Sequence, residues 1–192
     1  SRAANPLPGL LVTRHGHLPT GLAVWPGVET IEAGHPYPDD NSVLAAQKAL
    51  AIATQLEAGD HLLFLLSGGG SALLAAPADG VSLTDKQQVT RALLQSGATI
   101  EEINCVRKHL STIKGGRLAA VAGARGAELL TCLISDVAGD DPALIASGPS
   151  IGAPFEPDAA LTVLARAGWD VAPDLANVIH ANRPPEVAPH PV

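Results

Sequence analysis

The segment LLFLLSGGGSALLA, at residues 62–75, contains the residue types that most directly suggest binding chemistry. An apolar run ends in a serine, three glycines follow, and a second serine precedes another apolar stretch. In α/β sheets, ligands bind beyond the carboxyl ends of the strands, where loops lead into helices. Three glycines there would let several backbone N–H groups approach a phosphate or carboxylate without any cationic side chain. A tight turn without a ligand is the alternative, and spacing alone does not separate the two. We predict an anion site formed by Ser67, Gly68, Gly69, Gly70 and Ser71.

A second segment, SDVAGDDPALIASGPS at residues 135–150, also follows an apolar run and brings three carboxylates close together. It should therefore leave the sheet at the same edge as residues 67–71. Carboxylates beside a phosphate site hold Mg²⁺ or accept the proton of an attacking hydroxyl group. Asp136, directly at the strand end, is the stronger candidate for a catalytic role, and Asp140 is a candidate Mg²⁺ ligand. Asp140 and Asp141 precede Pro142, so an ordinary turn that caps the next helix is the alternative.

A third segment, NCVRKHLSTIKGGRLA at residues 104–119, concentrates positive charge in an otherwise acidic chain. Phosphoryl transfer needs positive charge to neutralise the transferring oxygen atoms. A basic run is more commonly a solvated helix face, but here it accompanies a glycine-rich loop and an Asp-bearing loop in one domain. Lys108 is a catalytic candidate, and Lys114 and Arg117 are candidates for substrate binding. His35, in the stretch GHPYPDDNS, is a further substrate-binding candidate, with a structural turn residue as its alternative.

The elements that must hold these segments alternate between strands and helices. Short β-type stretches are predicted at residues 9–14, 21–25 and 28–33. The continuous apolar runs at residues 61–66 and 128–134 are typical of strands that are covered on both faces, as in parallel sheets.

Helices are predicted between these strands. One runs from Asp40, Asn41 or Ser42 to about residue 56, with Gly59 after it. Two more have capping-box spacing, at Thr84–Gln87 and Thr99–Glu102, and others begin near residues 115 and 156. The order predicts a three-layer α/β/α domain, with a doubly wound, mostly parallel sheet flanked by helices.

Composition narrows the class of protein further. The chain has 192 residues, 46% of them hydrophobic, and a formal net charge of −7, which argues against nucleic-acid or membrane binding. No run is long enough to cross a bilayer, and no leader peptide is recognisable, so we expect a cytoplasmic protein. The two cysteines have no metal-type spacing. There is no methionine, and the opening SRAANPLPGLLVTR resembles a cut end, so we expect a piece of a longer protein.

Four motifs in this order resemble the type 2 glycerate kinase family, whose members are also described as hydroxypyruvate reductases of tartrate degradation. The resemblance covers about residues 10–170. It implies transfer of the γ-phosphate of ATP to the 2-hydroxyl group of D-glycerate, assisted by Mg²⁺. It also implies a Rossmann-like large domain, a smaller C-terminal domain called MOFRL, and an active site in the cleft between them. The motifs are GHPYPDDNS, LLSGGGSALL, VRKHLSTIKGGRLA and LISDVAGDDPALIASGPS.

Carried onto this sequence, the resemblance implies a role for each segment. Residues 67–71 would contact phosphate or the glycerate carboxylate, and Lys108 would offset charge on the transferring group. Asp136 would orient or deprotonate the 2-hydroxyl group, or hold Mg²⁺; the two roles stay open.

The chain also departs from the family pattern. The upstream Gly-Lys motif of the family has no counterpart before Leu10, and the C-terminal domain is absent. We predict a flexible lead-in at residues 1–9, the central part of the large domain at 10–180, and a proline-rich linker towards the C-terminal domain at 181–192. Such a fragment alone would be inactive, and a homodimer stays open.

Two other functions compete with the kinase. An NAD(P)H-dependent hydroxypyruvate reductase ranks lower, because SGGGSA lacks the third glycine of G-x-G-x-x-G and no acidic residue follows at the expected distance. A non-catalytic α/β domain that binds an anion is the third hypothesis.

Overall fold

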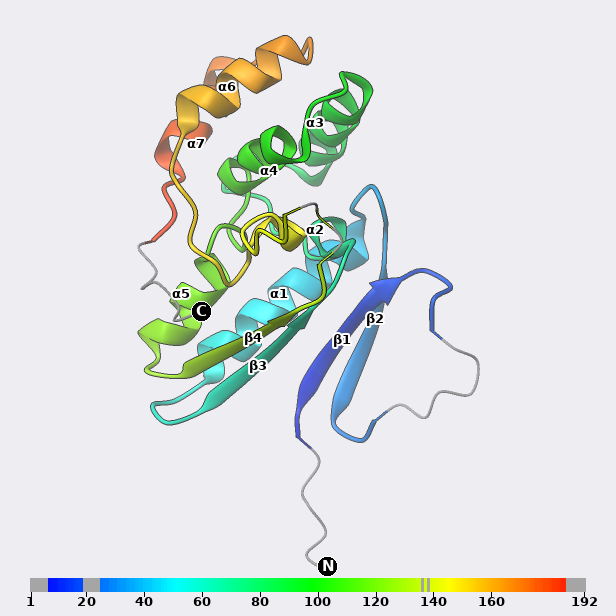
Figure 1. The fold of residues 1–192 in the computed structure, drawn as a ribbon, viewed down its shortest axis with the longest axis vertical. Coiled ribbons are helices and arrows are strands. Elements are labelled where there is room, and N and C mark those ends of the chain that lie inside the picture. Colours follow the sequence, from blue (N-terminus) through cyan, green and yellow to red (C-terminus); the bar gives the residue numbers. More distant parts are fainter. Residues whose placement is uncertain (1–6, 19–24, 136, 138, 186–192) are drawn as a thin grey trace, which may run out of the picture.

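Two pairs of parallel strands form the sheet layer of the fold (Figure 1). The computed structural model describes residues 7–18, 25–135, 137 and 139–185. β1 (Gly9–Arg14) pairs with β2 (Val28–Ala33), and β3 (His61–Leu66) pairs with β4 (Glu128–Leu133). The parallel α/β architecture is confirmed. The stretch predicted at 21–25 falls almost wholly outside the described residues, as do residues 1–6 and 186–192 of the two predicted end segments.

The described helices connect these strands and extend beyond them. They are α1 (Asp40–Gln55), α2 (Gly70–Leu73), α3 (Leu83–Gln95), α4 (Ile100–His109), α5 (Arg117–Ala124), α6 (Pro157–Arg166) and α7 (Pro173–Ala181), with a short 3₁₀ turn at Ile145–Ser147. None of the described helices is long and apolar enough to span a membrane.

The N-terminus of α1 is fixed by Asp39, one residue before the earliest predicted cap. Its carboxylate accepts hydrogen bonds from the Ser42 N–H at 2.9 Å and from His15 Nε2 at 2.7 Å. Burial acts to raise the pKa of Asp39, but these hydrogen bonds and one from the Gly34 backbone outweigh it and lower the pKa to about 2. Asp39 thus ties the start of α1 to the ends of β1 and β2.

Two further caps test the predicted capping boxes. The box at Thr99 and Glu102 is confirmed at the start of α4. The prediction at Thr84 is wrong, because Ser82 caps α3 and pairs reciprocally with Asp85. A serine followed three residues later by an acid satisfies the same N–H groups, so α3 begins two residues earlier.

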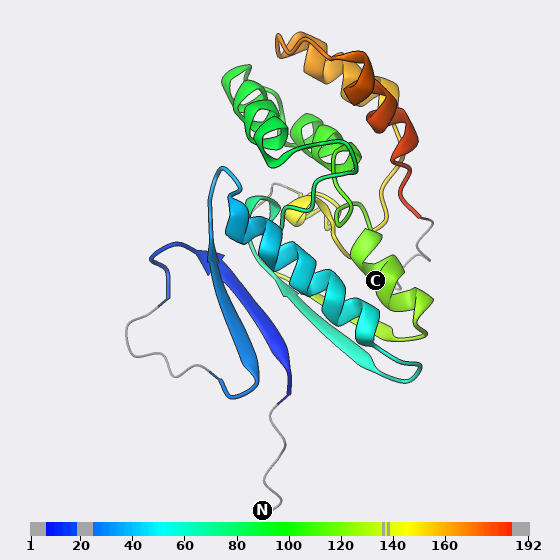
Figure 2. The ribbon, with the colours of Figure 1, turned by 180° about the vertical axis from the view of Figure 1, so that it is seen from behind.

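One face of the sheet layer is covered by α1 and α5 (Figure 2). Small buried residues of α1, including Ala45, Ala46 and Ala53, let that helix approach the strands closely. On the other face, Leu63 is 57% exposed, Leu65 is 67% exposed and Leu130 is 63% exposed. The prediction that these strands are covered on both faces is therefore not met by the described residues.

The remaining long helices form a second core beyond the sheet. Val89 and Leu93 of α3 pack with Val106 of α4, Leu164 of α6 and Ile179 of α7. The predicted apolar stripes are thus buried, each such side chain contributing roughly 1.5–3 kcal/mol, but helix packs on helix and not on the sheet. In Figure 1 this group lies past the carboxyl ends of β3 and β4.

Candidate functional site

The loops predicted to carry chemistry meet at the carboxyl edge of the strands. β3 and β4 run in parallel with Leu66 opposite Leu133, and the Ile134 N–H donates to the Leu66 carbonyl at 2.9 Å. The loops that follow therefore begin side by side. They touch directly, because the hydroxyl oxygens of Ser71 and Ser147 lie 2.8 Å apart. This adjacency is what the sequence predicted for residues 67–71 and 135–150.

The glycine loop leaves its backbone donors free. The N–H groups of Gly68, Gly69, Gly70 and Ser71 donate to no acceptor among the residues that the structure describes. The first N–H groups of a helix have no acceptor within that helix, and α2 begins at Gly70. Here they are available to the oxygen atoms of a phosphate or carboxylate.

The glycines also make room for neighbouring segments. Gly69 has a φ of +86°, and a Cβ at this position would lie 3.2 Å from the His35 ring. A Cβ on Gly70 would lie 2.8 Å from the Ala146 Cβ and 3.0 Å from Leu66 Cδ1. Packing therefore accounts for two of the glycines, the loop also offers unpaired donors, and an anion site at residues 67–71 stays a prediction.

The 3₁₀ turn opposite this loop is strained and firmly held. Ala146 and Ser147 have φ values of +51° and +62°, a region that side chains other than glycine rarely adopt. The Ser147 hydroxyl donates to Asn104 Oδ1 at 2.7 Å, and the Ser147 carbonyl accepts from the Gly115 N–H at 3.1 Å. Gly115 thus approaches this turn, whose serine reaches the glycine loop.

Three cationic side chains gather beside the glycine loop. Lys86 is 6% exposed, and its ammonium group donates a hydrogen bond to the Leu110 carbonyl at 2.9 Å. Lys114, 1% exposed, donates to the carbonyls of Leu74 and Ala146 at 3.1 and 3.4 Å. Arg107 is half-buried and has no hydrogen-bond or ion-pair partner within the described part of the chain.

Burial and mutual repulsion weaken the charged forms of these groups. Burial lowers the pKa of Lys86 to about 7, with further lowering by Arg107 and Arg117. Burial also lowers the pKa of Lys114 well below its ordinary value, and Lys86 and Arg107 act in the same direction. No carboxylate of the described residues opposes these shifts. A chain with a net charge of −7 therefore gathers three basic groups at this edge, although their surroundings disfavour the charged forms.

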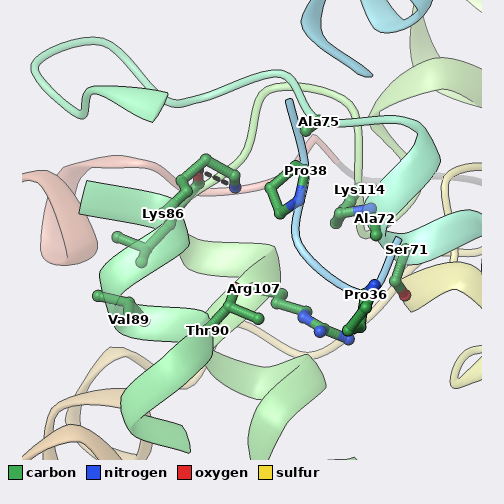
Figure 3. A pocket seen from close by; sticks show the side chains of 11 residues that line it. Pro36, Pro38, Ser71, Ala72, Ala75, Lys86, Val89, Thr90, Arg107 and Lys114 are labelled. Carbon is green, nitrogen blue, oxygen red and sulfur yellow. Dashed lines mark hydrogen bonds between the residues drawn. The ribbon is translucent and has the colours of Figure 1, made fainter. Parts of the chain in front are cut away.

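A small cavity lies between these cations (Figure 3). Its volume is about 20 Å³, which is room for one or two water molecules. The Arg107 side chain reaches across it towards Pro36, Lys86 lies on one wall, and Lys114 and Ser71 lie on the other. The loop after β2, the start of α2, and helices α3 and α4 thus enclose one positively charged space; its lining is Pro36, Pro38, Ser71, Ala72, Ala75, Lys86, Val89, Thr90, Arg107, Leu110 and Lys114.

The other predicted basic residues occupy different environments. Lys108 does not line the cavity; burial lowers its pKa, while Cys105, Asp141 and Glu156 act to raise it. The Arg117 guanidinium donates to the carbonyls of Lys108, Lys114 and Asn182. These contacts join α4, α5 and α7. A role for Lys108 in phosphoryl transfer and for Arg117 in substrate binding stays a prediction.

His35 lies at the rim of the site, with its ring against Gly69. Burial lowers its pKa, and so do the nearby charges of Arg14 and Arg107. A histidine that stays neutral can accept a hydrogen bond from a ligand hydroxyl group. The structure thus brings His35 beside the glycine loop, while its contact with substrate stays a prediction.

The acidic candidates are placed less fully. Asp136 lies outside the described residues. Asp140 is exposed with a φ of +52°, and Asp141 accepts the Ala143 N–H at 2.9 Å, as expected of an Asp-rich turn. The described residues contain no group of three or more His, Cys, Asp or Glu side chains that could hold a metal ion. Asp140 as a Mg²⁺ ligand stays a prediction.

Sequence reasoning missed Lys86, and it named Arg107 only as part of the basic run. The signal for Lys86 was its spacing: it precedes Val89 by three residues and Leu93 by seven, so it lies on the buried stripe of α3. Ser147 and Asn104 were also missed. Nothing in the local pattern of either residue indicates that their side chains meet.

The fold and the site define a parallel α/β domain that presents unpaired backbone N–H groups and basic side chains at one edge. The family described as "Domain of unknown function (DUF4147)" matches residues 1–180, and the chain belongs to this family. Chains with named activities are similar to it. A putative hydroxypyruvate reductase of Agrobacterium vitis is 48% identical over 174 residues, which cover 90% of this chain and 38% of the relative. A D-glycerate 2-kinase of Thermotoga maritima is 43% identical over 176 residues, covering 92% and 41% respectively.

Solved structures give the same picture. A crystal structure of glycerate kinase from Thermotoga maritima superposes with a TM-score of 0.83 at 42% identity, over 94% of this chain and 42% of that one. A structure from Pyrococcus horikoshii gives a TM-score of 0.79 at 39% identity, over 91% and 39%. The resemblance to glycerate kinases is thereby confirmed, and this chain spans about two-fifths of the length of these relatives.

Proposed function

We propose that the protein to which this chain belongs is a glycerate 2-kinase, which transfers the γ-phosphate of ATP to the 2-hydroxyl group of D-glycerate. One observation carries the proposal: the unpaired backbone donors of residues 67–71 lie at the same edge of the sheet as three buried or half-buried basic side chains. Relatives from Thermotoga maritima and Pyrococcus horikoshii, which bear the names D-glycerate 2-kinase and glycerate 2-kinase, support the same activity.

The reaction needs positioning and charge more than covalent help from the protein. The 2-hydroxyl oxygen forms a bond to the γ-phosphorus while the bond from that phosphorus to the β–γ bridging oxygen breaks. ADP leaves with that electron pair, and the hydroxyl proton passes to a base. The products are 2-phosphoglycerate and ADP.

Each segment has a part in this proposal. The N–H groups of residues 67–71 would hold phosphate oxygens, and Lys108 would offset their negative charge. Asp136 would accept or orient the hydroxyl proton, while His35, Lys114 and Arg117 would contact the substrate. Mg²⁺, which Asp140 would help to hold, supplies charge neutralisation at the phosphates when bound. The C-terminal domain of the same protein would form the second wall of the cleft, and a homodimer is left open.

The test uses the protein expressed from its full reading frame, with D-glycerate, ATP and Mg²⁺, and detects 2-phosphoglycerate. We expect Asp136→Asn to lower kcat by roughly 10²–10⁴-fold, because a positioned base is lost. The matched control is Asp170→Asn, because Asp170 is exposed in the connection between α6 and α7; it should retain full activity. Absence of 2-phosphoglycerate from the unmodified protein refutes the function, and near-normal turnover of Asp136→Asn removes Asp136 from the mechanism.

The reductase hypothesis is retained because a 48%-identical relative bears that name. The structure gives it little support. The glycine loop leads into α2, a single turn of four residues, whereas dinucleotide sites place the pyrophosphate at the start of a long helix. Oxidation of NADH on addition of hydroxypyruvate to the purified full-length protein would reverse this ranking.

A further inference from the structure

We propose that the cavity between α2, α3 and α4 is a carboxylate subsite, in which Arg107, Lys86 and Lys114 bind the carboxylate group of the 2-hydroxy acid. This inference rests on the proposed function for the identity of its ligand. It assigns a specificity-determining role to Lys86 and Arg107, neither of which the predicted site included.

The first support is the partnering of the three cations. The guanidinium of Arg107 has no described partner, although it lines the cavity. Lys86 satisfies one of its donors, at the Leu110 carbonyl. A planar guanidinium matches the two oxygens of a carboxylate. Buried charge without a counter-ion is unfavourable, so an anionic group in this space would stabilise all three side chains.

The second support is size. About 20 Å³ accommodates one or two water molecules, so only a small terminal group of a ligand, such as a carboxylate, could enter it. It is too small for a nucleotide. The larger anion, a chain of phosphates, would instead lie on the open N–H groups of the glycine loop.

The third support is continuity between the two anion sites. Ser71 belongs to the glycine loop and also lines the cavity. In a 2-hydroxy acid the reacting hydroxyl is on the carbon next to the carboxylate. Anchoring the carboxylate beside the phosphate loop therefore brings the 2-hydroxyl, and not the 3-hydroxyl, close to the transferring group.

A binding experiment separates this subsite from the catalytic activity. Calorimetry of the full-length protein would measure the Kd of D-glycerate, of its neutral amide and of ATP. We expect Arg107→Gln and Lys86→Met each to raise the Kd of D-glycerate at least about tenfold, because each substitution removes a charge-assisted contact. Binding of the amide and of ATP should change less than threefold. The matched controls, Arg166→Gln and Lys48→Met, remove cations that pair with carboxylates elsewhere on the surface and should bind as the unmodified protein does.

Proton uptake gives a second readout. Lys86 faces Arg107, Arg117 and Lys114, with the Leu110 carbonyl as its acceptor. With a pKa of about 7, roughly nine-tenths of its side chains are neutral at pH 8. A bound carboxylate restores the charged form, so D-glycerate binding at pH 8 should take up close to one proton at Lys86, in addition to any proton that Lys114 takes up. The slope of binding enthalpy against buffer ionisation enthalpy measures this uptake, and Lys86→Met should lower it by about that amount.

The outcomes are distinguishable. Unchanged glycerate affinity in both variants, or loss of ATP affinity in place of glycerate affinity, overturns the subsite even if 2-phosphoglycerate is formed. Glycerate binding with proton uptake that Lys86→Met abolishes, in a protein that forms no 2-phosphoglycerate, supports the subsite and refutes the kinase.

Discussion

Replacing Lys86 by methionine should stabilise the unliganded protein, and the gain should depend on pH. Lys86 is buried among apolar residues of α3 and α4, and methionine has nearly the same length without the charge. At about 1.36 kcal/mol per pH unit, a fall in the pKa from 10.5 to about 7 corresponds to about 5 kcal/mol of unfavourable burial and of repulsion by Arg107 and Arg117. Methionine also loses the hydrogen bond to the Leu110 carbonyl, and this loss offsets roughly 1–2 kcal/mol of the gain in stability.

The sign of the pH dependence follows from proton binding. Between pH 7 and 10.5 the unfolded chain binds a proton at Lys86 that the folded chain has released, so the free energy of unfolding rises with pH. For a folded pKa of about 7, the rise from pH 7 to pH 9 is about 2 kcal/mol. Lys114, whose pKa is also lowered, adds to it in the same direction. Lys86→Met should therefore be about 3 kcal/mol more stable than the unmodified protein at pH 7 and less than 1 kcal/mol more stable at pH 9.

Urea unfolding of the full-length protein at pH 7, 8 and 9 measures these differences, with Lys48→Met as the control. Lys48 pairs with Glu29 at the surface, at 2.9 Å, and its replacement should leave the pH dependence unchanged. If Lys86→Met is destabilised at pH 7, and by the same amount at pH 9, then the Lys86 charge is compensated in the folded protein. The electrostatic reasoning used for the cavity would then be wrong.

Three further substitutions probe the geometry of the site and its edge. Ser147→Ala should destabilise the protein by about 1–3 kcal/mol, because it leaves the buried Asn104 oxygen without its donor; urea unfolding measures the loss, and an unchanged midpoint would contradict the assigned hydrogen bond. Gly70→Ala should lower the free energy of unfolding by about 1–3 kcal/mol through overpacking against Ala146. Gly123→Ala, with open space around it in α5, should raise that free energy by roughly 0.5–1 kcal/mol. Equal effects of the two substitutions would refute the steric argument. Asp39→Ala should cost about 1 kcal/mol at neutral pH through loss of the α1 cap, and the difference should fade in thermal melts as the pH drops from about 4 towards the folded-state pKa of about 2.

Local pattern was enough to predict most of the elements, because local interactions decide them. The spacing of Val89 and Leu93 identified the buried face of α3, and the Thr99–Glu102 box marked the start of α4. What these helices pack against was not predictable in the same way. Periodicity shows which face is buried but not which neighbour covers it, so helices expected on the sheet pack on one another.

The site was predictable where backbone chemistry defines it, and much less so where long-range contacts do. Three consecutive glycines after an apolar run signalled the loop at residues 67–71. The left-handed conformations of Ala146 and Ser147 have no local sequence signal, since neither residue type favours them. Lys86 was missed because a lysine is usually read as a solvent-facing residue, even on a buried stripe.

The fold itself explains why Arg117 is buried, but it does not explain the position of Arg107. Arg117 donates to three backbone carbonyls and connects three helices, so its burial is accounted for by the fold itself. Arg107 and Lys86 face a cavity, and their charges repel. Together they make one described hydrogen bond, from Lys86 to the Leu110 carbonyl. Residues that lower stability and make no compensating contact within the fold persist where function requires them. The strongest reason to place a ligand in this cavity is therefore that the empty protein would be more stable without its charges.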